Sequence, residues 1–433
     1  MSLLSFLQRS YRAIINPPDR GTKVNPVRFG LLGASTIAPL ALIGPAKSHP
    51  EAIVAAVAAR DRARAVEYAR KHAIPIVHDT YEDLLDDKSI DAVYIALPNG
   101  LHYEWALRSL QAGKHVLLEK PATSNATDAE KLFRHPLATG PNAPVLLEAF
   151  HYQFHPAWQA FLGEVRQAGT VGAVHSRQTI PLGALAPEDI RFDFALGGGC
   201  LMDVGTYALS AVRQVLDRES VQVVHATHQT LTRKAFRDEL SASQIDISMN
   251  ASLSTSSGKV ATITSDIASG CEWPSCLSQA WRFRIPHVTI PMCQAVMEEV
   301  PLDALSGFEG AEHRMQKTVT IWNYLLPVVW HRIDITENHR IVSEGKCFKQ
   351  WTQTRFVKSY EWVKSEKNTG LYENWWTTWR CQLEEFVHRV KQRTGSGVWV
   401  EAEESIAQMV TIDEIYRKAG LMVRPSSTYE HAS

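Results

Sequence analysis

Two side chains of this sequence, Lys120 and Tyr207, are suited by type and context to move a proton to or from a hydroxyl group. Lys120 follows the apolar run His115–Leu118 within a Glu-Lys-Pro triplet, and Tyr207 closes the pentapeptide Asp-Val-Gly-Thr-Tyr that begins at Asp203. A tyrosine with its ordinary pKa of about 10 is a poor base near neutrality, but a nearby ammonium group would favour the phenolate. We therefore predict that Tyr207 is a general acid/base tuned by Lys120, with Asp203 orienting Lys120 or a substrate hydroxyl. In the alternative interpretation, Asp203 only caps its helix and Tyr207 is an interfacial side chain.

Oxidation of an alcohol requires that a hydride leave the carbon while a base removes the hydroxyl proton, and the N-terminal part of the chain carries a pattern for the hydride acceptor. The apolar run Val27–Leu32 leads into small residues and then into a helix whose first turn tolerates Pro39. The backbone N–H groups of such a turn attract a pyrophosphate. The turn resembles G-x-G-x-x-A, with Ser35 in place of the second glycine. It predicts cofactor contacts from Gly33, Ala34, Ser35, Thr36 and Ile37.

The end of the second apolar run, 53–59, bears on the choice between NADP and NAD. Arg60 follows this run directly, and Arg64 lies one helical turn further on. Arginine in this place suits a 2′-phosphate by charge and by its fork of donors, so we predict NADP rather than NAD. Alternatively, Arg60 is a solvated residue at a helix start and Asp61 caps the helix.

All these side chains require a sheet whose strands end at one edge. Apolar runs at 27–32, 53–59, 92–97, 115–118 and 145–147 alternate with helical patterns that include 103–111 and 125–134. This alternation predicts an α/β fold with a Rossmann-type, doubly wound parallel sheet, in which ligands bind beyond the carboxyl ends of the strands. Further strands are predicted at 221–227, 245–251, 260–266, 281–288 and 332–336.

A chain of 433 residues exceeds the size that one core usually serves, so we expect two main domains. We predict a helical extension at 1–25, a dinucleotide-binding domain at 26–150, a substrate and dimerisation domain at 151–425, and a tail at 426–433. The first 15 residues are basic, free of acidic residues and amphipathic. We favour a helix docked on the body over a mitochondrial presequence, because two prolines at 17 and 18 end it.

Composition argues against several kinds of partner. Lys and Arg number 45 against 46 Asp and Glu, which gives no electrostatic reason to expect nucleic acid or an anionic membrane. We see no apolar run long enough to span a bilayer. The six cysteines are scattered without metal-ligand spacing, so we predict no metal, and reduced thiols in a cytoplasmic protein.

With these residues placed, the chain resembles the Gfo/Idh/MocA oxidoreductase family, especially its trans-dihydrodiol and NADP-dependent D-xylose dehydrogenases. The segments that carry the resemblance include GLLGASTIAP at 30–39, LPNGLHYEW at 97–105, AGKHVLLEKP at 112–121 and GGGCLMDVGTY at 197–207. It covers about 27–215 and 379–425, whereas 255–375 shows little. The resemblance implies a second, α+β domain with a large, mostly antiparallel sheet, a homodimer formed through that sheet, and an aldose or cyclic diol as small-molecule substrate.

The same resemblance implies roles for individual residues. Those expected beside the cofactor are Leu97, Pro98, Asn99, His102, Glu119 and Lys120, with His102 either bonding a ribose hydroxyl or solvated. Those expected beside the substrate are Arg191, His151, Gln153 and Tyr207. Gln153 stands where the family often carries an arginine.

Two other interpretations of the chain stay open, as does the placement of its tryptophans. It could be a non-catalytic NADP-binding regulator of the same fold. It could instead be a biosynthetic enzyme acting on a larger, non-sugar substrate, because 255–375 does not match. The tryptophans abundant between 273 and 379 suit either an apolar sheet face that pairs with a second copy or the core.

Overall fold

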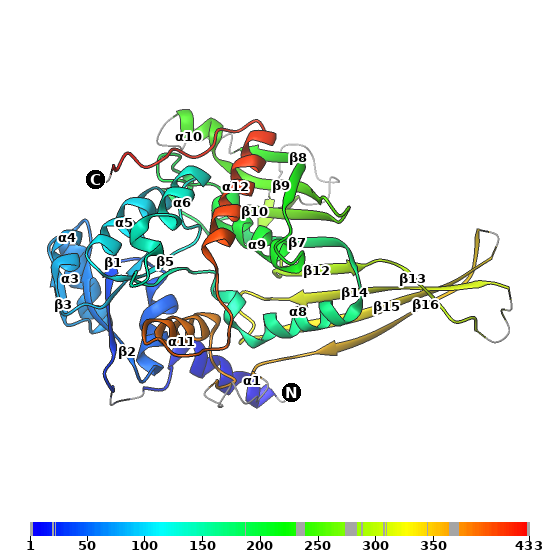
Figure 1. Cartoon of the computed structure of the whole chain (residues 1–433), viewed down its shortest axis with the longest axis horizontal. Helices are drawn as coiled ribbons and strands as arrows, with labels where there is room; N and C mark the ends of the chain where they lie inside the picture. Colours follow the sequence, from blue (N-terminus) through cyan, green and yellow to red (C-terminus); the bar gives the residue numbers. More distant parts are fainter. Residues whose placement is uncertain are drawn as a thin grey trace.

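The computed structural model describes residues 3–19, 21, 23–186, 188–230, 239–272, 284–286, 289–305, 308, 310–343, 345–362 and 372–430. Two sheets organise these residues (Figure 1). The first is a six-stranded parallel sheet formed by residues from the N-terminal third of the chain. The second is a larger, mostly antiparallel sheet that ends in a long projecting arm. The predicted fold class is confirmed.

The first sheet has the strand order β3-β2-β1-β4-β5-β6, all parallel, which is the order of a dinucleotide-binding fold. Its strands are β1 (Val27–Leu32), β2 (Ala52–Ala58), β3 (Ile76–His78), β4 (Ala92–Ile95), β5 (His115–Leu118) and β6 (Leu146–Glu148). The helices between them are η2 (Pro39–Ile43), α2 (Gly44–Ser48), α3 (Arg62–His72), α4 (Tyr81–Asp86), η3 (Asn99–Leu101), α5 (His102–Gln111), α6 (Ala126–Phe133) and α7 (Pro136–Thr139). Continuous apolar strands fit a sheet covered on both faces.

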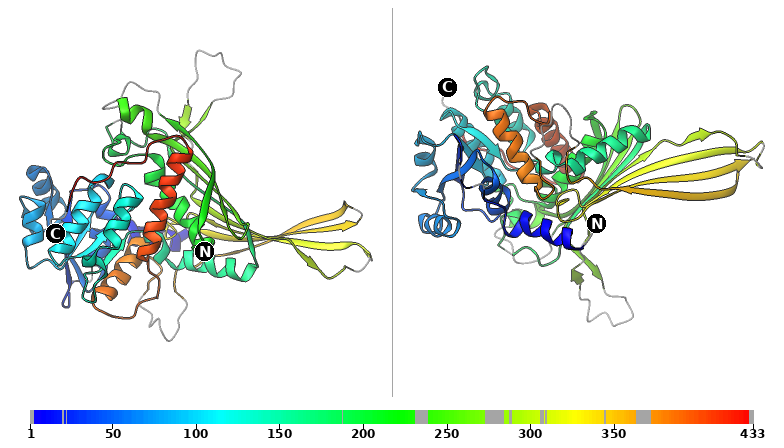
Figure 2. Two further views of the ribbon diagram at one scale, coloured as in Figure 1. Left: turned by 45° about the horizontal axis from the view of Figure 1, so that its top comes forward. Right: turned by 90° about the horizontal axis from the view of Figure 1, so that it is seen from below.

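The second sheet has the order β16-β15-β14-β12-β7-β10-β9-β8, with β11 and β13 paired at its side. Only β7 and β10 pair in parallel along this path. The strands are β7 (Val171–Pro181), β8 (Val221–Thr230), β9 (Asp246–Thr255), β10 (Val260–Glu272), β11 (Arg284–Pro286), β12 (Met292–Met297), β13 (Val300–Leu302), β14 (Glu312–Trp322), β15 (Arg332–Ser343) and β16 (Lys346–Val357). Of the strand expected at 281–288, only 284–286 lies within the described residues. The far ends of β13–β16 extend well beyond the body of the molecule (Figure 2).

One face of this sheet packs against helices. These are α8 (Pro156–Ala168), which contacts β14, and α9 (Thr206–Val215), which contacts β7, β10 and β12. Residues pointing to the opposite face of the central strands are mostly polar: Asn250, Ser252, Thr262, Thr264 and Thr318 are small, and His175, Arg177 and Gln294 lie beside them. The suggestion that tryptophans make this face apolar must be corrected for Trp375, Trp376 and Trp379, which are only 3%, 4% and 6% exposed within the core. Trp273 and Trp281 lie outside the described residues.

The other helices of the second half of the fold are η4 (His151–Phe154), η5 (Ile190–Phe192), the π-helical turn η6 (Leu201–Gly205), α10 (Glu239–Gln244), α11 (Thr378–Val390) and α12 (Ala402–Lys418). Two of them, α11 and α12, join the two domains. Although α11 follows the second sheet in the chain, it packs against η2, α2 and η4, and Phe386 contacts Phe29 of β1. The helix α12 packs between α6 of the first domain and β8 and α9 of the second. One hydrophobic core therefore runs through both domains.

Both ends of the described chain are bonded to the body. The N-terminal helix α1 (Leu3–Ser10) continues into a π-helical turn, η1 (Tyr11–Ile15), and Arg9 donates to the carbonyl oxygen of Val328 at 2.6 Å. At the other end, Arg424 pairs with Asp246, and both side chains are fully buried. Segment 421–430 also reaches the first domain, where the Ser427 amide donates to Asp128. No helix among the described residues is both long and apolar enough to cross a membrane.

Candidate active site

A cavity of about 540 Å³ lies between the two domains. The first domain contributes Ser35, Thr36, Ile37, Ala96, Leu97, Asn99, Glu119 and Lys120 to its wall. The second domain contributes His151, Gln178, Ile180, Ile190, Arg191, Leu196, Gly198, Gly199, Asp203, Val204, Tyr207, Leu325, Leu326 and Trp379. The cavity thus has one wall at the carboxyl ends of the parallel strands, where a doubly wound fold binds its ligands.

The turn after β1 forms a cradle on the first wall. Gly33 has a φ of +102°, and a Cβ there would lie 3.0 Å from a Leu97 side-chain carbon and 3.2 Å from the Ala96 carbonyl oxygen. Ser35 accepts a hydrogen bond from the Ala38 amide through Oγ (3.3 Å), and its carbonyl oxygen accepts from the hydroxyl of Tyr68 (2.9 Å). A backbone held this close to the sheet and leading into a helix start fits the pyrophosphate of a dinucleotide.

The two arginines after β2 lie at the edge of this cradle. Arg60 is exposed, and Arg64 donates to the carbonyl oxygen of Ala34 at 2.9 Å. Asp61 caps α3 by accepting from the amides of Ala63 and Arg64. Both guanidinium groups thus stand outside the cavity, beyond the turn.

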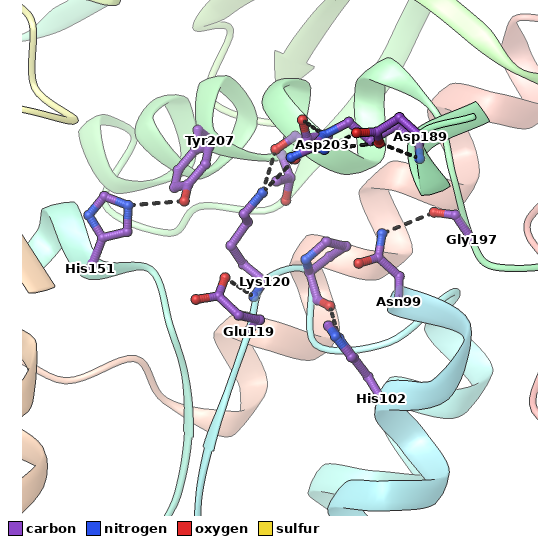
Figure 3. A network of polar contacts seen from close by, with 12 residues as sticks. Asn99, His102, Glu119, Lys120, His151, Asp189, Gly197, Asp203 and Tyr207 are labelled. Atoms are coloured by element: carbon purple, nitrogen blue, oxygen red, sulfur yellow. Dashed lines mark hydrogen bonds and ion pairs between the residues drawn. The ribbon is translucent and has the colours of Figure 1, made fainter. Parts of the chain in front are cut away.

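The centre of the second wall is an ion network around Asp203 (Figure 3). The ammonium group of Lys120 donates to the Asp203 carboxylate at 3.0 Å and to its carbonyl oxygen at 2.8 Å. Arg191 donates to the other carboxylate oxygen of Asp203 and also pairs with Asp189. Burial raises the pKa of Asp203, but Lys120 and Arg191 outweigh burial and lower it to about 2. The carboxylate therefore stays ionised and holds both cations in place.

Tyr207 lies beside this network on the first turn of α9. The Lys120 nitrogen is 4.7 Å from the centre of the Tyr207 ring, so the two predicted groups converge. The pKa of Tyr207 is nevertheless raised well above its usual value, first by burial and then by the negative charges of Glu119 and Asp203. The expectation that Lys120 produces a phenolate here must be corrected, because Asp203 engages the ammonium group.

The hydroxyl of Tyr207 contacts a histidine instead. Its oxygen is 3.0 Å from Nε2 of His151, and Nδ1 of His151 is 2.7 Å from Oγ1 of Thr378. The His151 ring stacks on Trp379 with a centroid distance of 4.2 Å. His151 was expected beside a substrate; the structure places it at the cavity wall, bonded to Tyr207.

Two other expected contacts need correction. His102 is fully buried, and its ring nitrogens lie 2.9 Å from the carbonyl oxygens of Pro121 and Leu97, so it does not face the cavity. Gln153 is also buried, and its amide donates to Ser210 and Glu404 behind the cavity wall.

Of the remaining predicted residues of the first domain, three line the cavity and one does not. Leu97 and Asn99 line the cavity, whereas Pro98 only precedes the short helix η3. Glu119 lines it too, and burial raises the pKa of its carboxyl group, which accepts a hydrogen bond from Tyr94.

Sequence reasoning missed several residues of the second wall. Leu325 and Leu326 come from the loop between β14 and β15, and Trp379 comes from α11. The run Gly197-Gly198-Gly199, by contrast, indicates from the sequence a glycine loop, and Gly198 and Gly199 of this loop line the cavity. Gly199 has a φ of +129°, and a Cβ there would meet the Asp246 and Arg424 side chains at 2.3 and 2.4 Å. The loop at 325–326 had no signal, because β14 was not predicted.

In comparisons with known proteins, each of the two domains matches a family model. Residues 27–139 match a model described as an oxidoreductase family with an NAD-binding Rossmann fold, and residues 161–284 match the Gfo/Idh/MocA C-terminal domain. The chain is 43% identical over 191 residues to D-xylose 1-dehydrogenase (NADP(+)) 2 of Haloferax volcanii, a match covering 43% of this chain and 57% of that protein. It is 30% identical over 273 residues to trans-1,2-dihydrobenzene-1,2-diol dehydrogenase of Xenopus tropicalis, covering 57% of this chain and 77% of that protein.

A solved structure shares the overall fold. It is KijD10, a 3-ketoreductase from Actinomadura kijaniata in complex with NADP and TDP-benzene. The TM-score is 0.64 at 22% identity, and the match covers 91% of this chain and 98% of that one.

Proposed function

Because the chain belongs to the Gfo/Idh/MocA oxidoreductase family, we propose that it transfers hydride between NADP and the hydroxyl or carbonyl carbon of an aldose or cyclic diol. Relatives named as a D-xylose dehydrogenase and a dihydrodiol dehydrogenase support this substrate class. The observation that carries the proposal is that Lys120 of the first wall and Asp203 and Tyr207 of the second wall meet in the interdomain cavity.

The residues of the first wall fit the cofactor. The backbone at 33–37 would hold the pyrophosphate, and Arg60 and Arg64 would hold a 2′-phosphate beyond it. When bound, the cofactor supplies the site that accepts or donates the hydride. Lys120, fixed by Asp203, would bond the ribose next to the nicotinamide.

The chain's own residues handle the proton. Tyr207 would donate it to, or accept it from, the substrate oxygen at its hydroxyl. Arg191 and Asp203 present polar atoms that can orient a neighbouring hydroxyl, while Leu325, Leu326 and Trp379 close the cavity with apolar surface.

Replacing Tyr207 with Phe tests the proposal. We expect kcat for an aldose or diol to fall about 10²–10⁴-fold, the usual contribution of a positioned acid/base, with little change in the Kd of NADPH. The measurements are steady-state turnover over a panel of aldoses and diols, and titration of NADPH fluorescence. Tyr152→Phe is the matched control, because that buried hydroxyl bonds Ser210 and does not line the cavity. Equal turnover in Tyr207→Phe and the wild-type protein would contradict the assignment.

A second candidate is a larger, less polar substrate. It is favoured by the apolar side chains Ile180, Ile190, Leu325 and Leu326 on the second wall, two of which come from the segment without recognised family motifs. Poor turnover of every simple aldose, together with turnover of a bulkier alcohol, would favour this candidate.

We also propose a cytoplasmic homodimer formed through the outward face of the second sheet. The centre of that face carries polar side chains, among them Thr262, Thr264 and Arg177, so the interface that we propose is a polar one. Cys200, Cys293, Cys347 and Cys381 are free thiols, as expected in a reducing compartment.

A further inference from the structure

We propose that His151 is the proton acceptor of Tyr207, so that the pair forms a relay poised for alcohol oxidation. The inference rests on the proposed function, because the relay serves a hydride transfer in the same cavity. His151 acts through Tyr207 and is therefore a positioning residue: it holds the proton that Tyr207 gives up.

The contact between the two side chains is direct and shielded from water. Nε2 of His151 lies 3.0 Å from the Tyr207 oxygen, and the two rings meet edge to face with centroids 5.5 Å apart. Trp379 covers the imidazole at 4.2 Å. His151 is 2% exposed and Tyr207 9%. Water therefore competes poorly for this hydrogen bond.

The surroundings of Thr378 fix which nitrogen of His151 carries the hydrogen. Oγ1 of Thr378 is 3.3 Å from the carbonyl oxygen of Leu325, which can only accept, so the threonine hydroxyl donates there. With its hydrogen directed at Leu325, the Thr378 oxygen accepts from His151, whose Nδ1 is 2.7 Å away, so we assign the ring hydrogen to Nδ1. Nε2 is left with a lone pair directed at the hydroxyl of Tyr207.

Lys120 is less able to take this role. Two of its N–H groups are donated to Asp203, and the ammonium group stands over the ring of Tyr207 rather than at its oxygen. Burial and the charges of Glu119 and Asp203 raise the pKa of Tyr207 well above its usual value. Tyr207 is therefore a neutral phenol, which can take a substrate proton only by passing on its own.

The relay balances as follows during oxidation of an alcohol. The substrate C–H bond breaks and its electron pair leaves with the hydrogen, as hydride, to the oxidised nicotinamide. The substrate O–H bond breaks toward Tyr207, the Tyr207 O–H bond breaks toward Nε2 of His151, and a carbonyl group forms. One positive charge is lost at the nicotinamide and one appears on the imidazole. Carbonyl reduction is the reverse and requires the imidazolium form.

The charged and titratable groups facing His151 determine how the rate depends on pH. Lys120 faces it from the end of β5, Tyr207 from α9 and His155 from the start of α8, while α11 presents Thr378 and Trp379. Burial, and then Lys120, hold the pKa of His151 well below its usual value. The imidazole is thus neutral near pH 7 and has a free position for a proton, but its lowered pKa makes proton transfer from Tyr207 the uphill part of the relay. A free histidine has a pKa of about 6.5, and that of His151 lies well below this value. The rate of oxidation by the wild-type protein should therefore change little between about pH 6 and 9, because His151 does not titrate in this range.

The test combines two variants of the relay with a control. In His151→Ala we expect kcat for oxidation to fall about 10²-fold or more and to rise with pH, since Tyr207 must then lose its proton to solvent. Added imidazole should restore part of the rate. Thr378→Val should lower kcat with little change in KM, and Thr378→Ser should restore it. His155→Asn is the control, because it removes a neighbouring buried histidine and keeps a helix-capping side chain.

A second measurement does not depend on turnover. In ¹⁵N-histidine-labelled protein without cofactor, the His151 signals, assigned by their loss in His151→Ala, should show a protonated Nδ1 and an unprotonated Nε2. A protonated Nε2, or His151→Ala with the wild-type rate and pH profile, would overturn the relay. If the wild-type protein turns over no aldose or diol, the proposed function fails, while the NMR result still decides whether the relay geometry is right.

Discussion

Asp203 is a carboxylate shared by two cations, and this sharing sets the electrostatics of the site. Lys120 and Arg191 together lower its pKa from 3.8 to about 2, against the effect of burial. A depressed pKa stabilises the folded state above the unfolded value, and this contribution is lost as the pH falls from about 4 to about 2. Across the physiological range Asp203 therefore stays charged and Lys120 stays oriented. The ammonium group that was predicted to activate Tyr207 is thus engaged by Asp203.

At the same scale, Arg60 tests the choice of cofactor. If its guanidinium group binds a 2′-phosphate, Arg60→Ala should raise the Kd of NADPH about 10–100-fold, the equivalent of about 1.5–3 kcal/mol for a charge-assisted hydrogen bond. The Kd of NADH should change little. Fluorescence titration of both nucleotides measures this. Arg62→Ala, which removes an exposed arginine paired with Asp79, serves as control. An equal loss for NADPH and NADH would count against a 2′-phosphate contact.

The elements of the first domain could be predicted closely, and many of those of the second could not. Strands β1 and β5 have the predicted bounds, because a strand buried on both faces is apolar throughout. Strand β16 was not predicted, since its residues are mostly exposed and polar and their pairing with β15 depends on a distant segment. Leu325 and Leu326 were not predicted to line the cavity, because they lie on the loop between β14 and β15 and β14 itself was not predicted. The contact between His151 and Tyr207 likewise joins separate elements, so no local pattern indicates it.

Strand β6 ends in a buried acid, Glu148, that supports the segment after Lys120. Its carboxyl group accepts a hydrogen bond from the Ala122 amide at 2.8 Å, and burial raises its pKa to about 7. A raised pKa means that the folded state binds the proton more tightly than the unfolded state. Stability should therefore fall as the pH rises from about 4.5 through about 7.

Glu148→Gln keeps the oxygen that accepts from Ala122 and removes the titration. We expect it to be as stable as the wild-type protein near pH 4.5, and more stable above pH 7 by up to about 3 kcal/mol. Urea unfolding of both proteins from pH 5 to 8 measures the difference. Glu67→Gln, at an exposed position of α3, should show no such trend. A stability difference that does not change with pH would argue against a raised pKa at Glu148.

At the scale of the whole molecule, the second sheet is covered by α8 and α9 on one face (Figure 2). The other face of its central strands carries mostly polar side chains, among them Thr264 and Arg177. The arm formed by β13–β16 enlarges this surface beyond the body. A second copy placed there would meet polar side chains such as Thr264 and Arg177 and, on β16, the exposed Phe356.

The proposed dimer can be tested on this face. Light scattering should give the wild-type protein a mass twice the 48.4 kDa of the chain. Thr264→Arg adds a second arginine beside Arg177 on the outward face and should yield a monomer, because this added positive charge would meet its own copy across the two-fold axis. Arg70→Glu on α3, an exposed site on the other domain, should leave the mass unchanged. A wild-type monomer would refute the dimer.

Segment 421–430 fastens the two lobes to each other. Arg424 holds Gly198 and Asp246 in the second domain, while Ser427 and the Arg424 carbonyl oxygen bond Asp128 and Asn125 in the first. A hinge motion that parted the lobes would break these bonds together and expose a buried ion pair, at a cost of several kcal/mol. These bonds hold the two domains in a fixed relative position. We therefore expect ligands to enter and leave through rotations of side chains at the cavity wall and shifts of short loops, with the two domains keeping their relative position.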